Sequence, residues 1–397
     1  MTYYFFVSLI RQSLHRQRLP CSIATKYHHH LKQQRRYNWS VASDTGIISY
    51  NNEPRFQTVI GLEVHAQLDI PQKLFSSAPV VAPHSRHAAV AAAAAAATAT
   101  AVPNTLIRPF DLAVPGVLPM TSKAAVQATI LTASALQCDI APVSRFERKH
   151  YHYADLPFGY QVTQQRWPIA TNGFIQAQVQ SSNKQTMKKK QKQQLFPIVR
   201  IDRIQLEQDT GKTTTSTRRI DNRDGTSTIT HYSMVDFNRA GCALVEIVMH
   251  PDIRSSQHAV ATVETLRQLL KHIGTCNGRM EEGSLRVDLN VSVHSIDGPE
   301  FQSNLYNRVE VKNLNSLRQV QQAADYEALR QVKIIVAEAE AATDNRKHGT
   351  VVKTFQETRT FHVKSGKTVL IRSKEGDEDY RFMPEPDLPP VVLDEVR

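Results

Sequence analysis

The chain has 397 residues and a formal charge of +11, which is long enough for two or three domains or for one large domain with an appendage. Twelve of its basic side chains lie in two short stretches, residues 1–42 and 184–194, and neither stretch contains an acid. The remainder is close to neutral. A uniformly basic nucleic-acid-binding surface is therefore excluded, and any contact with RNA depends on local patches.

Residues 1–50 are predicted to be an organellar import segment followed by a disordered lead. The first 42 residues are basic and free of acids, and Phe5, Phe6, Leu9 and Ile10 open an amphipathic stretch, as in segments that follow the membrane potential into an organelle. A disordered basic tail without a targeting role is the alternative. No run approaches the roughly 18 apolar residues of a membrane-spanning helix, so no membrane span is predicted.

Residues 51–393 are predicted to form the folded domain, which begins with the alternating strand "VIGLEVHAQL" at residues 59–68. Glu63, His65 and Gln67 share one face of this strand, and a rise of about 3.3 Å per residue places Glu63 and His65 about 6 to 7 Å apart. A carboxylate and an imidazole so placed could hold a divalent metal or act as an acid/base pair. A solvated face of an antiparallel sheet is the other interpretation.

Two low-complexity stretches are interpreted as surface insertions in this domain. One is the alanine-rich stretch at residues 83–102, and the other is the Lys/Gln run at about 180–195, which we expect to be a hairpin loop. The four cysteines lie far apart and form no C-x-x-C pair, which argues against a zinc ribbon.

Three helices are predicted among strands with one polar face. The first begins at Thr121 or Ser122, the second runs from the Ser255 region to Gly274, and the third begins near Ser316. Residues 285–294 and 308–312 alternate cleanly between apolar and polar side chains. Strands with one solvent-exposed face are typical of antiparallel sheets. The predicted class is α+β, with a mainly antiparallel sheet and helices packed on one side.

The polar faces of these strands suggest a site for a magnesium nucleotide. Glu246 is the one carboxylate in the apolar run 243–249, and such a charge requires a cation or a metal. Oxygen ligands suit magnesium, and guanidinium and ammonium groups suit phosphates. No glycine-rich phosphate loop is present, so a nucleotide would bind to the sheet face. The other polar residues of this predicted face are Glu63, His65, Arg203, Glu207, Asp209, Arg286, Asp288, Arg308 and Lys312.

A family resemblance is carried by nine ordered sequence blocks. In chain order they are "VIGLEVHAQL", "DLAVPGVLPM", "KHYHYADLPFGYQVTQ", "LEQDTGK", "VDFNRAGCALVEIV", "MEEGSLRVDLNVSV", "VEVKNLNS", "ETRTF" and "RSKEGDEDYRFMPEPDLPP". Together they resemble the B subunit of tRNA-dependent amidotransferases, from about Phe56 to about Leu393. The resemblance implies a cradle-shaped catalytic domain related to the glutamine synthetase and guanidino kinase fold.

The family's reaction implies cofactors, partners and a location. Members use Mg²⁺ and ATP to phosphorylate the side-chain carboxylate of glutamate misacylated on glutamine tRNA, and ammonia from a partner glutaminase then displaces the phosphate. A carboxylate accepts ammonia poorly because its leaving group would be oxide, so this activation is chemically required. The implied partners are an amidase-type A subunit and a small C-type or fungal-type subunit, in the mitochondrial matrix.

The resemblance also implies roles for particular residues. The expected catalytic residues are Glu63, His65, Glu207 and Glu246, with Asp209 as a further magnesium ligand. For nucleotide binding we expect Arg203, Arg286, Lys312 and Asn313, and for contact with the tRNA end Lys149, Tyr151, Tyr160 and Gln161. A structural salt bridge, turn or core role remains open for each of these two groups.

Three departures from the family pattern qualify the expectations. The segments that carry zinc-binding cysteines in many bacterial relatives lack them here, so no zinc is predicted. Gln208 stands where those relatives tend to have a second glutamate. One carboxylate of the expected metal site is therefore missing, and Glu207 or Asp209 would have to take its place. The family continues into helical and tail domains beyond the last block, whereas this sequence stops at Arg397, so it is either truncated or a form without those parts. A non-catalytic scaffold and a free-standing Mg-ATP kinase or ligase remain alternatives.

Overall fold

The computed structural model describes residues 39–80, 102–178, 195–221, 226–296, 308–344, 356–373 and 381–393. The predicted import segment up to residue 38 lies outside these ranges, as do residues 81–101 and 179–194, which contain nearly all of the two predicted insertions. The described residues from Ser40 onward belong to one compact unit. The mixed α+β class and the mainly antiparallel sheet are confirmed.

The sheet that organises the described residues has β3 near its centre. Its strand order is β16-β15-β14-β13-β3-β12-β9-β8-β4, and β2 also pairs with β3 and with β1. Neighbours are antiparallel except for β14 and β15, which are parallel. The strand bounds are β1 Trp39–Val41, β2 Ile47–Tyr50, β3 Glu53–Gln67, β4 Asp139–Ile140, β8 Ala170–Ile175, β9 Val199–Gln208, β12 Ala243–Met249, β13 Leu285–Ser295, β14 Val309–Leu314, β15 Glu357–His362 and β16 Lys367–Ser373.

Residues 39–50 correct one expectation, because they were assigned to a disordered lead. They form β1 and β2, and Ile48 is fully buried. Both the amide and the hydroxyl of Thr58 donate to the carbonyl of Gly46, which fixes the turn before β2. Gly46 has φ +70°, and a Cβ there would collide with the carbonyl of Arg254. The apolar side chain of Ile48 and this tight turn join the segment to the sheet.

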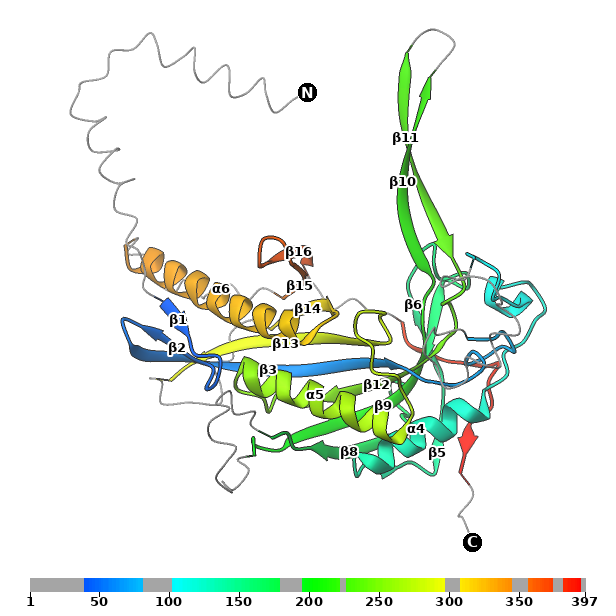
Figure 1. The fold of residues 1–397 in the computed structure, drawn as a ribbon, viewed down its shortest axis with the longest axis horizontal. Coiled ribbons are helices and arrows are strands. Elements are labelled where there is room, and N and C mark those ends of the chain that lie inside the picture. Colours follow the sequence, from blue (N-terminus) through cyan, green and yellow to red (C-terminus); the bar gives the residue numbers. More distant parts are fainter. Residues whose placement is uncertain are drawn as a thin grey trace, which may run out of the picture. The chain divides into compact units, whose positions relative to one another are not determined.

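Three smaller sheets accompany the main one. The first joins β6 (Glu147–His150), β7 (Tyr160–Thr163) and β17 (Met383–Pro384), and the second joins β5 (Val143–Ser144) to β18 (Val391–Val392). In the third, β10 (Lys212–Asp221) and β11 (Ser227–Asp236) pair only with each other. Figure 1 shows this hairpin extending away from the main sheet. The short 3₁₀ helix η1 spans Pro109–Leu112.

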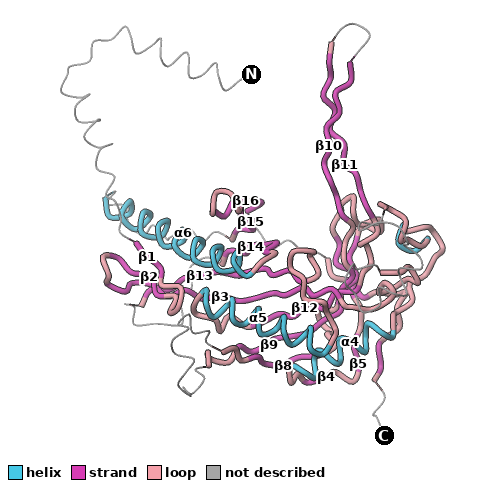
Figure 2. Tube along the Cα trace, in the orientation of Figure 1, coloured by secondary structure: helices cyan, strands magenta, loops and turns pink. Residues whose placement is uncertain are grey.

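Of the three α-helices in the described ranges, α4 (Lys123–Ala135) and α6 (Leu317–Asp344) pack against strands of the main sheet, and α5 (Ser256–Ile273) packs against both of these helices (Figure 2). The predicted ends of α5 are confirmed, because the Ser255 hydroxyl accepts from the amide of His258 and Gly274 closes the helix at φ +76°. Ser122 caps α4 in the same way. None of the helices in these ranges has the length and apolar character needed to cross a membrane.

The core lies between the helices and the sheet face that carries the apolar side chains of the strands. On β3, Leu62, Val64 and Ala66 are fully buried, whereas the intervening Glu63 and His65 are only partly so. The neighbouring Val245 and Val287 continue the buried parity into β12 and β13. This alternation leaves the opposite face of the sheet free to carry polar side chains.

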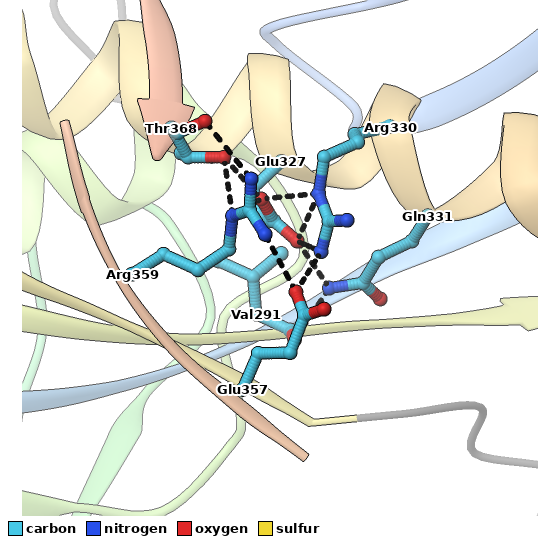
Figure 3. A network of polar contacts seen from close by, with 7 residues as sticks. All are labelled: Val291, Glu327, Arg330, Gln331, Glu357, Arg359 and Thr368. Carbon is cyan, nitrogen blue, oxygen red and sulfur yellow. Dashed lines mark hydrogen bonds and ion pairs between the residues drawn. The ribbon is translucent and has the colours of Figure 1, made fainter. Parts of the chain in front are cut away.

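A buried ionic network joins α6 to β15 and to the edge strand β16 (Figure 3). Glu327 is fully buried and accepts hydrogen bonds from Arg330, Gln331 and Thr368, and its carboxylate lies 3.7 Å from Arg359 Nε. Both arginines also contact Glu357, the first residue of β15. The network pairs its charges with one another, which is the condition for burying them.

Candidate functional site

The polar face of β3 meets polar residues of both neighbouring strands. His65 lies opposite Glu246 of β12 on one side and Arg286 of β13 on the other. Glu63 lies opposite Asp288 of β13. One strand further out, Gln205 of β9 is the register partner of Glu246. The sheet therefore gathers side chains that are far apart in the sequence.

His65, Glu207 and Glu246 form the one group in the described ranges whose His, Cys, Asp or Glu donors could hold a metal ion. One donor atom from each of the three lies within 4.8 Å of the others, and His65 Nε2 is 3.8 Å from Glu246 Oε1. The two carboxylates are 5% and 8% exposed. Two buried carboxylates beside an imidazole make a compact donor set for a divalent cation.

The electrostatics of this cluster favour a cation. Burial, and then the Glu246 carboxylate, raise the pKa of Glu207 above its ordinary value. Burial, and then the Glu63 carboxylate, likewise raise the pKa of Glu246. The Lys149 ammonium acts in the opposite direction on both, but more weakly than burial. A divalent ion would reverse this penalty because it interacts with the ionised carboxylates.

Glu63 and Asp209, also predicted as magnesium ligands, lie outside the three-residue group. Glu63 Oε1 accepts a hydrogen bond of 2.8 Å from the side-chain amide of Asn290. Asp209 Oδ2 is 3.0 Å from Arg286 Nη2 and 3.6 Å from Arg239 Nε, which are ion pairs without well-aligned hydrogen bonds. Asp209 directly follows the last residue of β9, and its backbone still bonds to the segment before β12 through the carbonyl of Cys242 and the amide of Gly241.

The residues predicted for nucleotide binding border the polar face at different points. Arg203 contacts Asp202 and Gln205, whereas Arg286 pairs with Asp209. Lys312 Nζ lies 2.6 Å from Glu310 and 3.4 Å from Asp288. Burial alone would lower the pKa of Lys312, but these two carboxylates raise it well above its usual range, so the ammonium stays charged.

Asn313, the fourth residue in that group, has a backbone rather than a side-chain role in the structure. Its amide donates to Asp288 Oδ1 at 2.9 Å, and its φ of +63° is in the left-handed region that asparagine tolerates better than most residues. The Asp288 carboxylate therefore joins the Lys312 ammonium to the backbone of β14 where its register with β13 shifts.

The residues predicted to meet the tRNA end lie on β6 and β7 and in the loop between them. Lys149 Nζ is 5.9 Å from the centre of the Tyr151 ring, and Tyr151 packs edge-on against Tyr153, which is 61% exposed. The guanidinium of Arg148 lies over the Tyr160 ring at 4.4 Å. This surface offers cations and partly exposed aromatic rings side by side.

Gln161 occupies a different environment from the other three. It is 6% exposed, and its amide nitrogen donates to Glu207 Oε1 at 2.6 Å and to the carbonyl of Gln208 at 2.8 Å. The amide therefore contacts the carboxylate cluster directly.

Sequence reasoning gave no role to Gln205, Asn290 or Thr163. The first two lie on the polar parity of their strands, so the alternation contained a signal for them. Thr163 ends β7 and hydrogen-bonds Glu207, but a threonine in a short strand has no distinguishing pattern.

The site lies within a region that matches a known protein family. Residues 58–397 match the family described as the GatB/GatE catalytic domain, a span that contains every site residue discussed above. The chain belongs to this family. The resemblance carried by the ordered sequence blocks is thereby confirmed.

Similar proteins agree with this assignment. The chain is 41% identical over 341 residues to the B subunit of human mitochondrial glutamyl-tRNA(Gln) amidotransferase, covering 86% of this chain and 52% of that protein. The zebrafish protein of the same name is also 41% identical, over 340 residues, with the same two coverages. The B subunit of an aspartyl/glutamyl-tRNA(Asn/Gln) amidotransferase from Synechococcus is 38% identical over 343 residues, which cover 86% of this chain and 59% of that protein. The chain thus spans little more than half the length of these relatives.

Proposed function

We propose that the chain is the catalytic part of the B subunit of a mitochondrial tRNA amidotransferase. It would use ATP and Mg²⁺ to phosphorylate the side-chain carboxylate of glutamate misacylated on glutamine tRNA, in the matrix. An amidase-type A subunit would supply the ammonia, and a small C-type or fungal-type subunit would complete the complex. The observation that carries the proposal is the group formed by the half-buried His65 and the buried Glu207 and Glu246 on the sheet face of a chain from this family.

The residues present fit a magnesium ion. Two carboxylate oxygens and one imidazole nitrogen can come from the protein, which leaves further coordination positions for water and phosphoryl oxygens. When bound, the ion would neutralise charge on the phosphoryl group being transferred. His65, Glu207 and Glu246 would hold it. Glu63, fixed by Asn290 at the edge of the group, and Asp209 add negative potential nearby.

The remaining polar residues supply binding and orientation. The guanidinium and ammonium groups of Arg203, Arg286 and Lys312 rim the same sheet face, where they can attract the phosphates of a nucleotide. Lys149, Tyr151 and Tyr160 lie on the small sheet beside the carboxylates, and their charge and rings suit the backbone and bases of a single-stranded acceptor end. Two substrates could thus meet at the carboxylate cluster from different sides.

The test compares wild type with Glu246→Gln and Glu63→Gln, assembled with an amidase-type partner. Each change keeps size and hydrogen-bonding capacity and removes one negative charge from the site. For Glu246→Gln we expect ATP hydrolysis that depends on misacylated tRNA to fall by about 10²-fold or more, in the range found when a transition-state electrostatic contact is lost. The effect of Glu63→Gln should be in the same direction. Glutamine hydrolysis by the partner should be unchanged because that chemistry lies on another chain.

The same assay separates the alternatives. If Lys149, Tyr151 and Tyr160 bind tRNA as proposed, ATP turnover should require misacylated tRNA. Turnover without tRNA would indicate a free-standing kinase or ligase, and no turnover in a wild-type complex that still hydrolyses glutamine and binds tRNA would indicate a scaffold. Either outcome would contradict the proposed function.

A further inference from the structure

Each buried carboxylate of the metal group is held by a glutamine. Gln161 of β7 donates its amide to Glu207 Oε1 at 2.6 Å, and its own carbonyl oxygen accepts from the Tyr151 hydroxyl at 2.7 Å. Gln205 of β9 donates to Glu246 Oε2, also at 2.6 Å, and its carbonyl oxygen accepts from Arg203 Nε at 2.9 Å. The two arrangements repeat the same order: an outer donor, a buried glutamine and a carboxylate.

The chemistry of the partners fixes the orientation of both amides. A carboxylate and the carbonyl of Gln208 can only accept, so the nitrogen of Gln161 must face them. Arg203 can only donate, so the oxygen of Gln205 must face it. A flipped amide would lose these bonds in either case. Both glutamines are thus locked with their donors toward the carboxylates.

Thr163 links the two arrangements. Its hydroxyl oxygen accepts from Gln205 Nε2 at 3.1 Å, and the same residue hydrogen-bonds Glu207. Gln161, Thr163 and Gln205 therefore form a continuous polar layer behind both carboxylates, and all three are buried. Buried and fully bonded polar layers of this kind hold geometry rigidly.

The polar layer offsets the repulsion between the two buried carboxylates. Two carboxylates close together and away from water repel each other and tend to turn apart or take up a proton, and either change would spoil a metal site. Neutral amide donors bond each carboxylate without adding a cation that would compete with the metal. Each amide bonds a single oxygen of its carboxylate, Oε1 of Glu207 and Oε2 of Glu246.

From this geometry we infer that Gln161 and Gln205 are positioning residues that hold Glu207 and Glu246 in metal-binding orientation and so set the affinity of the site. The inference rests on the proposed metal site and adds the residues that support it. Outer groups that orient metal ligands commonly change metal affinity by about 10- to 100-fold when removed. Tyr151 and Arg203, which fix the glutamines in turn, connect the support to the face where we propose that tRNA and nucleotide bind.

The test measures Mn²⁺ binding to the full chain by calorimetric titration, with Mn²⁺ as the probe for the divalent site. Gln161→Met and Gln205→Met keep the approximate volume and remove the amide. We expect each to weaken Mn²⁺ binding by about 10- to 100-fold. Tyr151→Phe removes only the hydroxyl that fixes Gln161, and we expect a weakening of a few-fold. This last variant keeps the test informative should a core substitution fail to fold.

Gln331→Met is the matched control. Gln331 is as buried as the other two, and its amide also donates to a carboxylate, Glu327, and to a backbone carbonyl, that of Val291. It lies on α6, in the ionic network that joins this helix to the sheet edge, so its loss should lower stability without changing Mn²⁺ affinity. A drop in affinity equal to that of Gln161→Met would show that general destabilisation explains the effect, and the inference would be wrong.

Glu246→Gln separates this inference from the proposed function. If the wild type binds Mn²⁺ and Glu246→Gln abolishes binding, the metal site stands. Unchanged affinity in Gln161→Met, Gln205→Met and Tyr151→Phe would then refute the positioning role alone. If the wild type binds no Mn²⁺, or Glu246→Gln binds it as tightly as the wild type, the metal site itself fails and the inference falls with it.

Discussion

Glu207 and Glu246 are two neighbouring carboxylic acids that are almost completely buried. Their pKa values are raised by burial first and then by neighbouring carboxylates, Glu246 acting on Glu207 and Glu63 on Glu246. In the metal-free folded state these groups hold protons more tightly than in the unfolded state, where a glutamate titrates at about pH 4.3. The metal-free site therefore costs stability at neutral pH, where the acids are forced to ionise.

This linkage predicts the sign of a pH effect. With metal removed by a chelator, the contribution of Glu207 and Glu246 to the free energy of unfolding should rise as the pH falls from about 7.5 to about 5, because these two groups hold protons more tightly in the native state than in the unfolded state. The gain should level off near the unfolded pKa. In Glu246→Gln one titrating group is absent and Glu207 loses a repulsive neighbour, so the rise should be smaller.

Urea unfolding at the two pH values, for wild type and Glu246→Gln, measures the difference. His258 and His294 have lowered pKa values and act in the opposite direction within this pH range, as Asp252 and Glu264 do toward its acid end, but all four are common to both proteins and cancel in the comparison. Equal pH dependence in the two proteins would contradict the electrostatic account of the site.

At the scale of elements, local sequence patterns determined much of the fold and part of the site. The cap at Ser255, the stop at Gly274 and the alternation around Glu63 and His65 could all be predicted because they depend on near neighbours in the chain. A shared polar face was also expected, but which of its residues become direct neighbours could not be predicted, because that depends on the strand order β9-β12-β3-β13. The grouping of His65 with Glu207 and Glu246 follows from the register of β3, β12 and β9, whereas Glu63 bonds to Asn290 and Asp209 pairs with Arg286.

Two other features show the same limit. The β10–β11 hairpin was not predicted, although an Asp-Gly pair at residues 224–225 between two threonine- and serine-rich stretches is a hairpin signal. The other strands were predicted from alternating buried and exposed side chains, and β11 has no buried side chain. The Glu327 network was also missed, because its members come from one helix and two distant strands.

Glu327→Ala tests how firmly α6 is held to the sheet edge. Removing this carboxylate leaves Arg330 and Arg359 buried with only Glu357 to share, and breaking a buried ion pair from one side typically costs about 3 to 5 kcal/mol. Chemical unfolding should show a loss of this size. Glu53→Ala is the control, because Glu53 pairs with Arg55 at an exposed position and should matter little. Equal losses in both variants would show that the network adds no specific stability.

At the scale of the whole molecule, the positive charge is concentrated outside the site. The basic stretches at residues 1–42 and 184–194 account for the net charge, whereas the site itself is rich in carboxylates. Attraction of tRNA to the site would therefore depend on local groups such as Lys149 and Arg148, and on parts of the assembly beyond this chain. Because the chain belongs to this family and is similar to mitochondrial relatives, its basic N-terminal segment is a candidate mitochondrial import signal.

We expect residues 1–43, fused to a fluorescent reporter, to direct it into mitochondria. The segment carries seven lysines and arginines and no acid up to Ala42, so the membrane potential should draw it inward. Replacing Arg11, Arg16 and Arg18 by glutamine in the same fusion should reduce import. A diffuse cytosolic signal from the unmodified fusion would show that the segment is not an import sequence.

The central claim, that His65, Glu207 and Glu246 share one divalent ion, is tested most directly by pulsed electron paramagnetic resonance of Mn²⁺ bound to the full chain. This method detects a nitrogen nucleus coordinated to the ion. We predict a single bound Mn²⁺ with nitrogen coupling in the wild type, loss of that coupling in His65→Gln, and loss of the bound ion in Glu246→Gln. Bound Mn²⁺ without nitrogen coupling in the wild type, retained at full affinity in Glu246→Gln, would contradict the account.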